Sequence, residues 1–187
     1  IFTQKMECQF CAESRGLAEE LAEQSEFVNA VVYDFEDNKK EADELGVDKI
    51  PAIVVRGKDK DYGIRFYGVP GGYEFTSFIE AIKLVSTGNH ELSEETTKFL
   101  DGLEKEVHLQ VFVTPTCPYC PTAVILGHRL AYYSDKVRSD MIEVSEFPQL
   151  GTKYQVQGVP RTVINETGSQ EGAAPEDMLI NTIKSAL

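Results

Sequence analysis

All four cysteines of this chain occur in two pairs of the pattern CxxC, Cys8–Cys11 and Cys117–Cys120. Two thiols with this spacing can bind a metal ion, close a structural disulfide, or exchange electrons with another disulfide. A thiol is activated as its thiolate, which is favoured at the positive end of a helix dipole. The chemistry of the two pairs therefore depends on the elements that position them.

The two halves of the chain repeat each other at a constant offset of 109 residues. This offset relates Cys8 to Cys117 and also Pro51 to Pro160, so each proline follows the first cysteine of its half by 43 residues. Two motifs that match at one offset indicate a tandem duplication of a unit of roughly 80 to 100 residues. Each unit is expected to contain one cysteine pair and one proline.

A polar stretch at residues 86–106 marks the boundary between the units, because it contains Gly, Asn and Ser and then a charged helical pattern. We expect a first unit at residues 1–88 and a second unit at residues 89–187 that opens with this linker helix. The chain begins at Ile1, close to Cys8, so we expect the first strand of the first unit to be truncated.

The same order of elements is predicted in each unit: strand, helix, strand, helix, two hairpin strands and a closing helix, with the second helix visible only in the first unit. In the second unit, the apolar run 109–114 predicts a buried strand directly before the cysteines, and 123–133 has helical spacing. A parallel crossover followed by a hairpin predicts an α/β fold, in which each unit has a mixed central sheet flanked by helices.

A CxxC motif after the first strand, a helix that starts at the motif and an aliphatic-Pro dipeptide before the hairpin together resemble the thioredoxin fold. Two such units, with the sequence CPYC in the second, are similar to the glutaredoxin-like protein disulfide oxidoreductases of thermophiles. The resemblance covers essentially the whole chain. It implies a cytoplasmic enzyme that reduces, oxidises or isomerises protein disulfides through two redox-active CxxC sites.

The position of each cysteine on its predicted helix indicates its role. The first cysteine of each motif lies at the helix N-terminus, so we expect Cys8 and Cys117 to be the attacking nucleophiles. Cys11 and Cys120 lie within the first helical turn, and we expect them to resolve the mixed disulfide with the substrate. The residues between the cysteines are expected to tune the redox potential; they are Gln9, Phe10, Pro118 and Tyr119.

The resemblance also assigns a role to the two prolines. It implies that Pro51 and Pro160 are cis prolines packed against the active-site disulfides. The preceding residues, Ile50 and Val159, would then expose main-chain groups that pair with a substrate strand. This would be a form of strand addition, in which the substrate backbone supplies the partners.

One departure from the thioredoxin pattern concerns proton transfer. Many thioredoxins carry a buried acid in the strand before the motif, whereas Phe2 and Val111 occupy that position here. Another group must accept the proton, and Glu7 is adjacent to Cys8, although we expect it to be solvated. None of the histidines has a spacing that requires a Cys-His dyad; they are His90, His108 and His128.

Three other functions use the same residues. Four cysteines in two CxxC pairs can form a structural zinc site. In such sites the two pairs usually lie about 15 to 20 residues apart, whereas Cys11 and Cys117 are 106 residues apart. An iron-sulfur cluster shared by two chains is a further metal hypothesis.

The chain could also be an electron-relay module, like the duplicated domain of alkyl hydroperoxide reductase flavoproteins, in which only one unit keeps its CxxC. A substrate-binding module with idle thiols would not need both pairs.

The composition limits the partners. A formal net charge of -13 argues against nucleic acids and anionic membranes, and no apolar run approaches the roughly 20 residues of a membrane span. We expect protein disulfides and dithiols as substrates and no bound cofactor or metal. Electrons are expected to come from a thioredoxin-reductase-type flavoenzyme or, as a weaker alternative, from glutathione.

Overall fold

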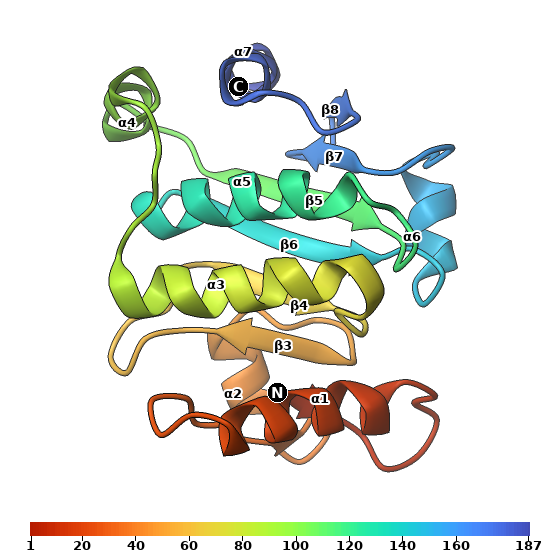
Figure 1. Ribbon diagram of the computed structural model, residues 1–187. Helices are drawn as coiled ribbons and strands as arrows, with labels where there is room; N and C mark the ends of the chain where they lie inside the picture. The colour runs from red at the N-terminus through yellow and green to blue at the C-terminus, as the bar shows by residue number, and fades with distance from the viewer.

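One continuous sheet organises the chain, and the computed structural model describes residues 1–187. The strands are β1 (Phe2–Thr3), β2 (Tyr33–Asp34), β3 (Ala52–Val55), β4 (Ile64–Tyr67), β5 (Val107–Val113), β6 (Val137–Glu143), β7 (Arg161–Ile164) and β8 (Gly168–Glu171). The helices are α1 (Cys11–Glu23), α2 (Lys39–Glu44), the 3-10 helix η1 (Gly72–Glu74), α3 (Phe75–Thr87), α4 (Glu94–Asp101), α5 (Cys120–Tyr133), α6 (Pro148–Lys153) and α7 (Glu176–Ala186). The eight strands lie in the order β2-β1-β3-β4-β6-β5-β7-β8 (Figure 1).

The predicted fold class is confirmed, and both halves show the predicted order of elements. The structure adds α6, which the sequence pattern of the second half does not indicate. The second strand predicted in the first unit is limited to the two residues of β2. In the second hairpin β8 forms although its side chains are polar, because it is the last strand of the sheet and only one of its faces packs on the protein.

The parallel pairing of β4 with β6 joins the two halves. Arg65 of β4 lies opposite Asp140 of β6, and Tyr67 lies opposite Ile142. Both strands are therefore interior to the sheet, and all four residues of β4 are buried. The sequence predicts a sheet within each unit but contains no signal for this pairing, which places the two sheets side by side as one.

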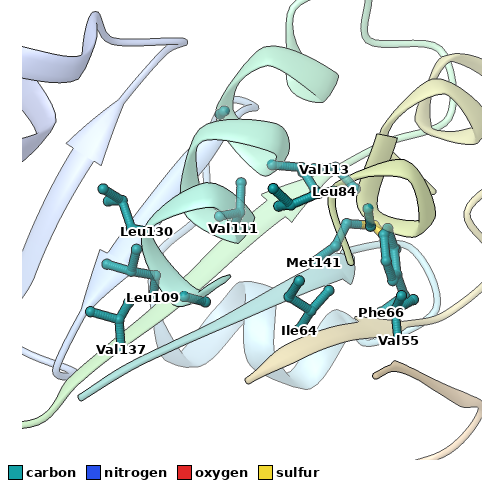
Figure 2. Packing of buried hydrophobic residues seen from close by; sticks show 14 of the residues in the cluster. Val55, Ile64, Phe66, Leu84, Leu109, Val111, Val113, Leu130, Val137 and Met141 are labelled. Atoms are coloured by element: carbon teal, nitrogen blue, oxygen red, sulfur yellow. The ribbon is translucent and has the colours of Figure 1, made fainter. Parts of the chain in front are cut away.

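Two hydrophobic cores cover the two faces of the sheet. The larger core lies between the sheet and a layer of helices that includes α1, α3, α5 and α7 (Figure 1). Figure 2 shows part of it, where Leu84 of α3 and Leu130 of α5 lie over apolar side chains of β4, β5 and β6. The smaller core lies on the opposite face, where Ala42 of α2 and Phe147 beside α6 pack on the strands.

A polar network in this second face crosses the junction between the halves. The buried carboxylate of Asp140 accepts a hydrogen bond from Arg138 Nε at 2.9 Å and pairs with His108 Nε2 at 2.6 Å. Arg138 also donates to Gly46 O and to the hydroxyl of Tyr67, both at 2.9 Å. Burial alone would raise the pKa of Asp140, but the His108 hydrogen bond and the Arg138 charge lower it to about 2.

We expect Asp140→Asn to lower the free energy of unfolding at pH 7 by about 3 kcal/mol, because it leaves Arg138 without its buried counter-charge. A carboxylate with a depressed pKa stabilises the fold above its ordinary pKa of 3.8 and loses that contribution as the pH falls toward 2. Urea unfolding at pH 7 and pH 3 measures both effects. The control is Asp135→Asn, which removes an exposed ion pair with Lys60. Equal unfolding midpoints for the parent and Asp140→Asn would contradict the role of the network.

Candidate active site

Both cysteine motifs lie at the same edge of the sheet. Strands β1, β4, β6 and β5 run in the same direction, because β3 is antiparallel to both β1 and β4 while β6 is parallel to both β4 and β5. Each motif follows the carboxyl end of its strand, β1 or β5. Four inter-strand spacings of about 4.8 Å separate these two strands, so their carboxyl ends lie about 19 Å apart along the edge.

In the first motif Cys8 and Cys11 form a disulfide with a Cα–Cα distance of 5.5 Å. Cys11 is the first residue of α1 and is 3% exposed, whereas Cys8 precedes the helix and is half-buried. The backbone N–H of Gln4 points at Cys11 Sγ at 3.4 Å. The outer cysteine is thus the accessible one, as expected for a nucleophile, and the inner cysteine is held in the first helical turn.

In the second motif Cys117 and Cys120 form a disulfide with the same Cα–Cα distance, 5.5 Å. Cys120 begins α5 and is fully buried, while Cys117 is 8% exposed. The backbone N–H of Cys120 donates to Cys117 Sγ at 3.2 Å. A donor already aimed at this sulfur stabilises a thiolate there when the disulfide is reduced. The first motif has no equivalent bond between Cys11 N and Cys8 Sγ.

The residues between the cysteines face solvent to different extents. Tyr119 is 70% exposed and Pro118 is also exposed. In the first motif Gln9 is exposed and Phe10 is half-buried at the start of α1. The tuning role of these residues stays a prediction. Their exposure means that each motif presents a chemically different surface to an approaching protein.

Both X-Pro bonds singled out by the sequence are cis, Ile50–Pro51 and Val159–Pro160. Val159 O lies 3.8 Å from Cys117 Sγ, so the dipeptide in the second unit does border its cysteine pair. Each proline carbonyl accepts one hydrogen bond from the glycine that follows the hairpin, Gly68 N at 3.0 Å for Pro51 and Gly172 N at 2.8 Å for Pro160. The substrate-binding role of these residues stays a prediction.

The sequence does not predict a buried carboxylic acid in η1, next to the loop that precedes Cys117. Glu74 of η1 is 1% exposed; its Oε2 accepts a hydrogen bond from Ser77 Oγ at 2.5 Å, and its Oε1 is buried without a partner. The adjacent Tyr73 N donates to Pro115 O at 3.0 Å, two residues before Cys117. Burial raises the pKa of Glu74 to about 7. Because this residue comes from the first half, no local pattern around Cys117 predicts it.

The histidines lie away from the cysteine chemistry. His108 pairs with Asp140, and His128 is buried against Phe66 with a ring-centroid distance of 4.8 Å. Burial lowers the pKa of His128 to about 4. No group of three or more His, Cys, Asp or Glu side chains is arranged to hold a metal ion. None of the helices has the length and apolar character needed to cross a membrane.

The family model for the thioredoxin domain matches residues 107–184. The alkyl hydroperoxide reductase AhpF of Escherichia coli is 28% identical over 159 residues, which cover 82% of this chain and 28% of that protein. The chain spans about a quarter of the length of the curated relatives it matches. The sequence likeness thus extends over both halves of the chain but over only one part of those proteins.

Two solved structures share the arrangement of the whole chain. The N-terminal domain of the alkyl hydroperoxide reductase AhpF from Enterococcus faecalis superposes with a TM-score of 0.89 at 23% identity, covering 96% of this chain and 87% of that chain, and shows the fold. A protein disulfide oxidoreductase from Aeropyrum pernix superposes with a TM-score of 0.92 at 30% identity, covering 99% of this chain and 83% of that chain. Two tandem thioredoxin-fold units, each with a CxxC pair, place this chain in the family of protein disulfide oxidoreductases.

Proposed function

We propose that this chain catalyses thiol-disulfide exchange on protein substrates, with one active site in each of two units at residues 1–88 and 89–187. The observation that carries the proposal is the pair of CxxC disulfides at the N-termini of α1 and α5, on one edge of the sheet. The aligned N–H groups at a helix N-terminus stabilise a thiolate, which is the attacking species in disulfide exchange. A purely structural disulfide does not need this position.

In the reductive direction, the Cys117 thiolate attacks one sulfur of the substrate disulfide and forms a mixed disulfide, while the other substrate sulfur leaves as a thiolate. Cys120 then loses its proton and attacks Cys117 Sγ, which releases the second substrate thiolate. Two electrons pass from the enzyme dithiol to the substrate, and the enzyme disulfide is left. Cys8 and Cys11 perform the same steps in the first unit, and the reverse sequence oxidises a substrate dithiol.

Ile50 and Val159 would bind the substrate main chain beside the cysteines. Each of these residues precedes a cis proline at the carboxyl-end edge that carries the motifs, and Val159 O lies near Cys117 Sγ. Because the strands that precede the two motifs end about 19 Å apart, we expect that neither disulfide reaches the other. Each site therefore acts on its own substrate disulfide, and electrons pass between sites only through a moving partner.

Glu74 is our candidate for the proton acceptor of the second site. Its carboxyl group is buried and its Oε1 has no hydrogen-bond partner, while the adjacent Tyr73 N contacts the loop before Cys117 through Pro115 O. A base with a pKa of about 7 is matched to proton transfer at neutral pH. It would accept the proton from Cys120 when this buried thiol becomes the resolving nucleophile. Glu74 would replace the acid that is absent from β5, where Val111 stands.

The electron source and the location follow from the same proposal. An oxidised CxxC must be reduced again by an external dithiol, for which we propose a thioredoxin-reductase-type flavoenzyme, with glutathione as the weaker alternative. We propose a cytoplasmic location, which agrees with the proposed reduction of protein disulfides. No cofactor takes part in the proposed exchange, since the cysteines themselves carry the electrons.

An electron-relay module is the second candidate function. The observation that favours it is the 28% identity to the alkyl hydroperoxide reductase AhpF over 82% of this chain. In a relay, the exposed face around Tyr119 would dock one dedicated partner instead of many disulfide-bonded proteins. Turnover with a general protein disulfide, such as that of insulin, separates the two functions, because a dedicated relay would not reduce it.

We expect Cys117→Ser to lower the rate of insulin disulfide reduction by about tenfold more than Cys8→Ser does, because Cys117 is the one outer cysteine of the two that has a backbone donor aimed at its sulfur. The rate is measured with dithiothreitol as reductant, and bound zinc and iron are determined on the same samples. The double variant Cys8→Ser/Cys117→Ser is the inactive control. An inactive parent that holds stoichiometric metal, lost on either substitution, would overturn the redox function.

We expect Glu74→Gln to change both stability and rate near pH 7. A carboxyl whose pKa is raised from 4.5 to about 7 costs stability as the pH rises between these values. Between pH 5 and pH 8 its deprotonation should lower the parent's free energy of unfolding by about 2 kcal/mol, and the variant should not show this decrease. In a Cys8→Ser background, where only the second site works, the pH-rate profile should lose its step near pH 7 and the rate should fall at least about tenfold. Glu95→Gln, at an exposed position of α4, is the control. An unchanged pH-rate profile would remove Glu74 from the mechanism.

A further inference from the structure

The carboxyl group of Glu146, in the second unit, contacts the proline loop of the first site, which we define as Ile50 and Pro51 with the adjoining Gly68 and Val69. Glu146, on the turn between β6 and α6, accepts a hydrogen bond from Val69 N through its Oε1 at 2.8 Å. Val69 directly follows Gly68, whose N–H donates to Pro51 O at 3.0 Å. Two consecutive backbone groups therefore link Glu146 to the cis proline of the first unit.

The turn that carries Glu146 is itself held in place. The side chain of Glu143, the last residue of β6, is 3% exposed. Its carboxylate accepts hydrogen bonds from Ser145 N at 3.2 Å, from Ser145 Oγ at 2.8 Å and from Glu146 N at 2.8 Å. A buried carboxylate with this many donors fixes the turn, so Glu146 is aimed at Val69 by the sheet and not by a mobile loop.

Gly68 shows how closely the two units approach at this contact. Its φ of 91° lies in the left-handed region, which favours glycine. A Cβ on Gly68 would lie 2.8 Å from Cβ of Glu143 and 3.0 Å from the carboxyl carbon of Glu146. Glu143 and Glu146 of the second unit occupy the space that a side chain at position 68 would need. The close approach of the two units at this point therefore requires a glycine.

The second site lacks this contact. Gly172 occupies the equivalent position, with a φ of 74° and its N–H on Pro160 O, but nothing lies within 4 Å of the place for its Cβ. The reason is topological: β4 has β6 as its next neighbour, whereas β8 is the last strand of the sheet. Asp37, the repeat counterpart of Glu146, is exposed and its side chain makes no hydrogen bond.

We propose that Glu146 is a positioning residue for substrate binding at the first site, acting through Val69 and Gly68 on the Ile50–Pro51 dipeptide. The inference rests on the proposed function, because it assumes that Ile50 pairs with the main chain of a protein substrate. It adds that the second unit is part of the first active site. The two sites then differ in how firmly their peptide-binding loops are held, although their motifs repeat.

The test uses two backgrounds of the full chain, Cys117→Ser with only the first site and Cys8→Ser with only the second. In the first background, Glu146→Ala should raise KM for insulin by about tenfold with kcat changed less than about twofold, since the hydrogen bond that orders the binding loop is lost. Glu146→Gln keeps an acceptor oxygen for Val69 N and should restore most of the KM. In the second background, Glu146→Ala should leave KM unchanged.

Two controls separate positioning from general damage. A small aromatic disulfide has no main chain to bind, so its rate at the first site should not respond to Glu146→Ala. Asp37→Ala removes the counterpart carboxylate and should leave KM for insulin unchanged at the first site. The thermal unfolding midpoint of each variant shows whether it is folded, and Glu146→Gln tests the same contact if Glu146→Ala is unstable.

The outcomes distinguish this inference from the proposed function. If the Cys117→Ser background has no insulin reductase activity, the proposed function fails at the first site, and the inference fails with it. If that background is active but Glu146→Ala leaves KM for insulin unchanged, or raises it equally at both sites, only the positioning role is overturned. A rise in KM confined to insulin at the first site supports it.

Discussion

The parallel pairing of β4 with β6 is the constraint on which the rest of the structure depends. Without it, the two repeated units would each have a sheet with an open edge of unpaired backbone groups at this position. With it, β4 and β6 become interior strands, and β1 and β5 run in the same direction. Both cysteine motifs therefore face the same side of the molecule, and a substrate can approach either without a rotation of one unit against the other.

This junction also makes the two sites unequal. The proline loop of the first site lies toward the middle of the sheet, where it contacts the second unit through Glu146 and Val69. The proline loop of the second site lies at the outer strands β7 and β8, but the acid beside its cysteine loop, Glu74, is contributed by the first unit. Each unit thus supplies a carboxyl group to the surroundings of the other unit's site. The two CxxC motifs therefore repeat in sequence, but the residues that surround them differ.

The carboxyl groups at the junction have opposite electrostatic character. Asp140 is charged and compensated, because Arg138 and His108 surround it in the smaller core. Glu74 has no cation beside it, so burial moves its pKa toward 7 and leaves it able to change charge at neutral pH. The first arrangement stabilises the junction of the two halves. The second costs stability at high pH, which is typical of a group that takes part in proton transfer.

The sequence by itself determined the repeat, the order of elements in each unit, the positions of the cysteines at two helix starts and the two prolines at matched positions. These features depend on short spacings and on apolar periodicity, which are local. It did not reveal α6, the β4–β6 pairing, Glu74 or Glu146. Strand pairing between distant segments is decided by the packing of both sheet faces, and a buried acid acquires its altered pKa only from the atoms that enclose it. Only the tertiary structure therefore decided which unit completes which site.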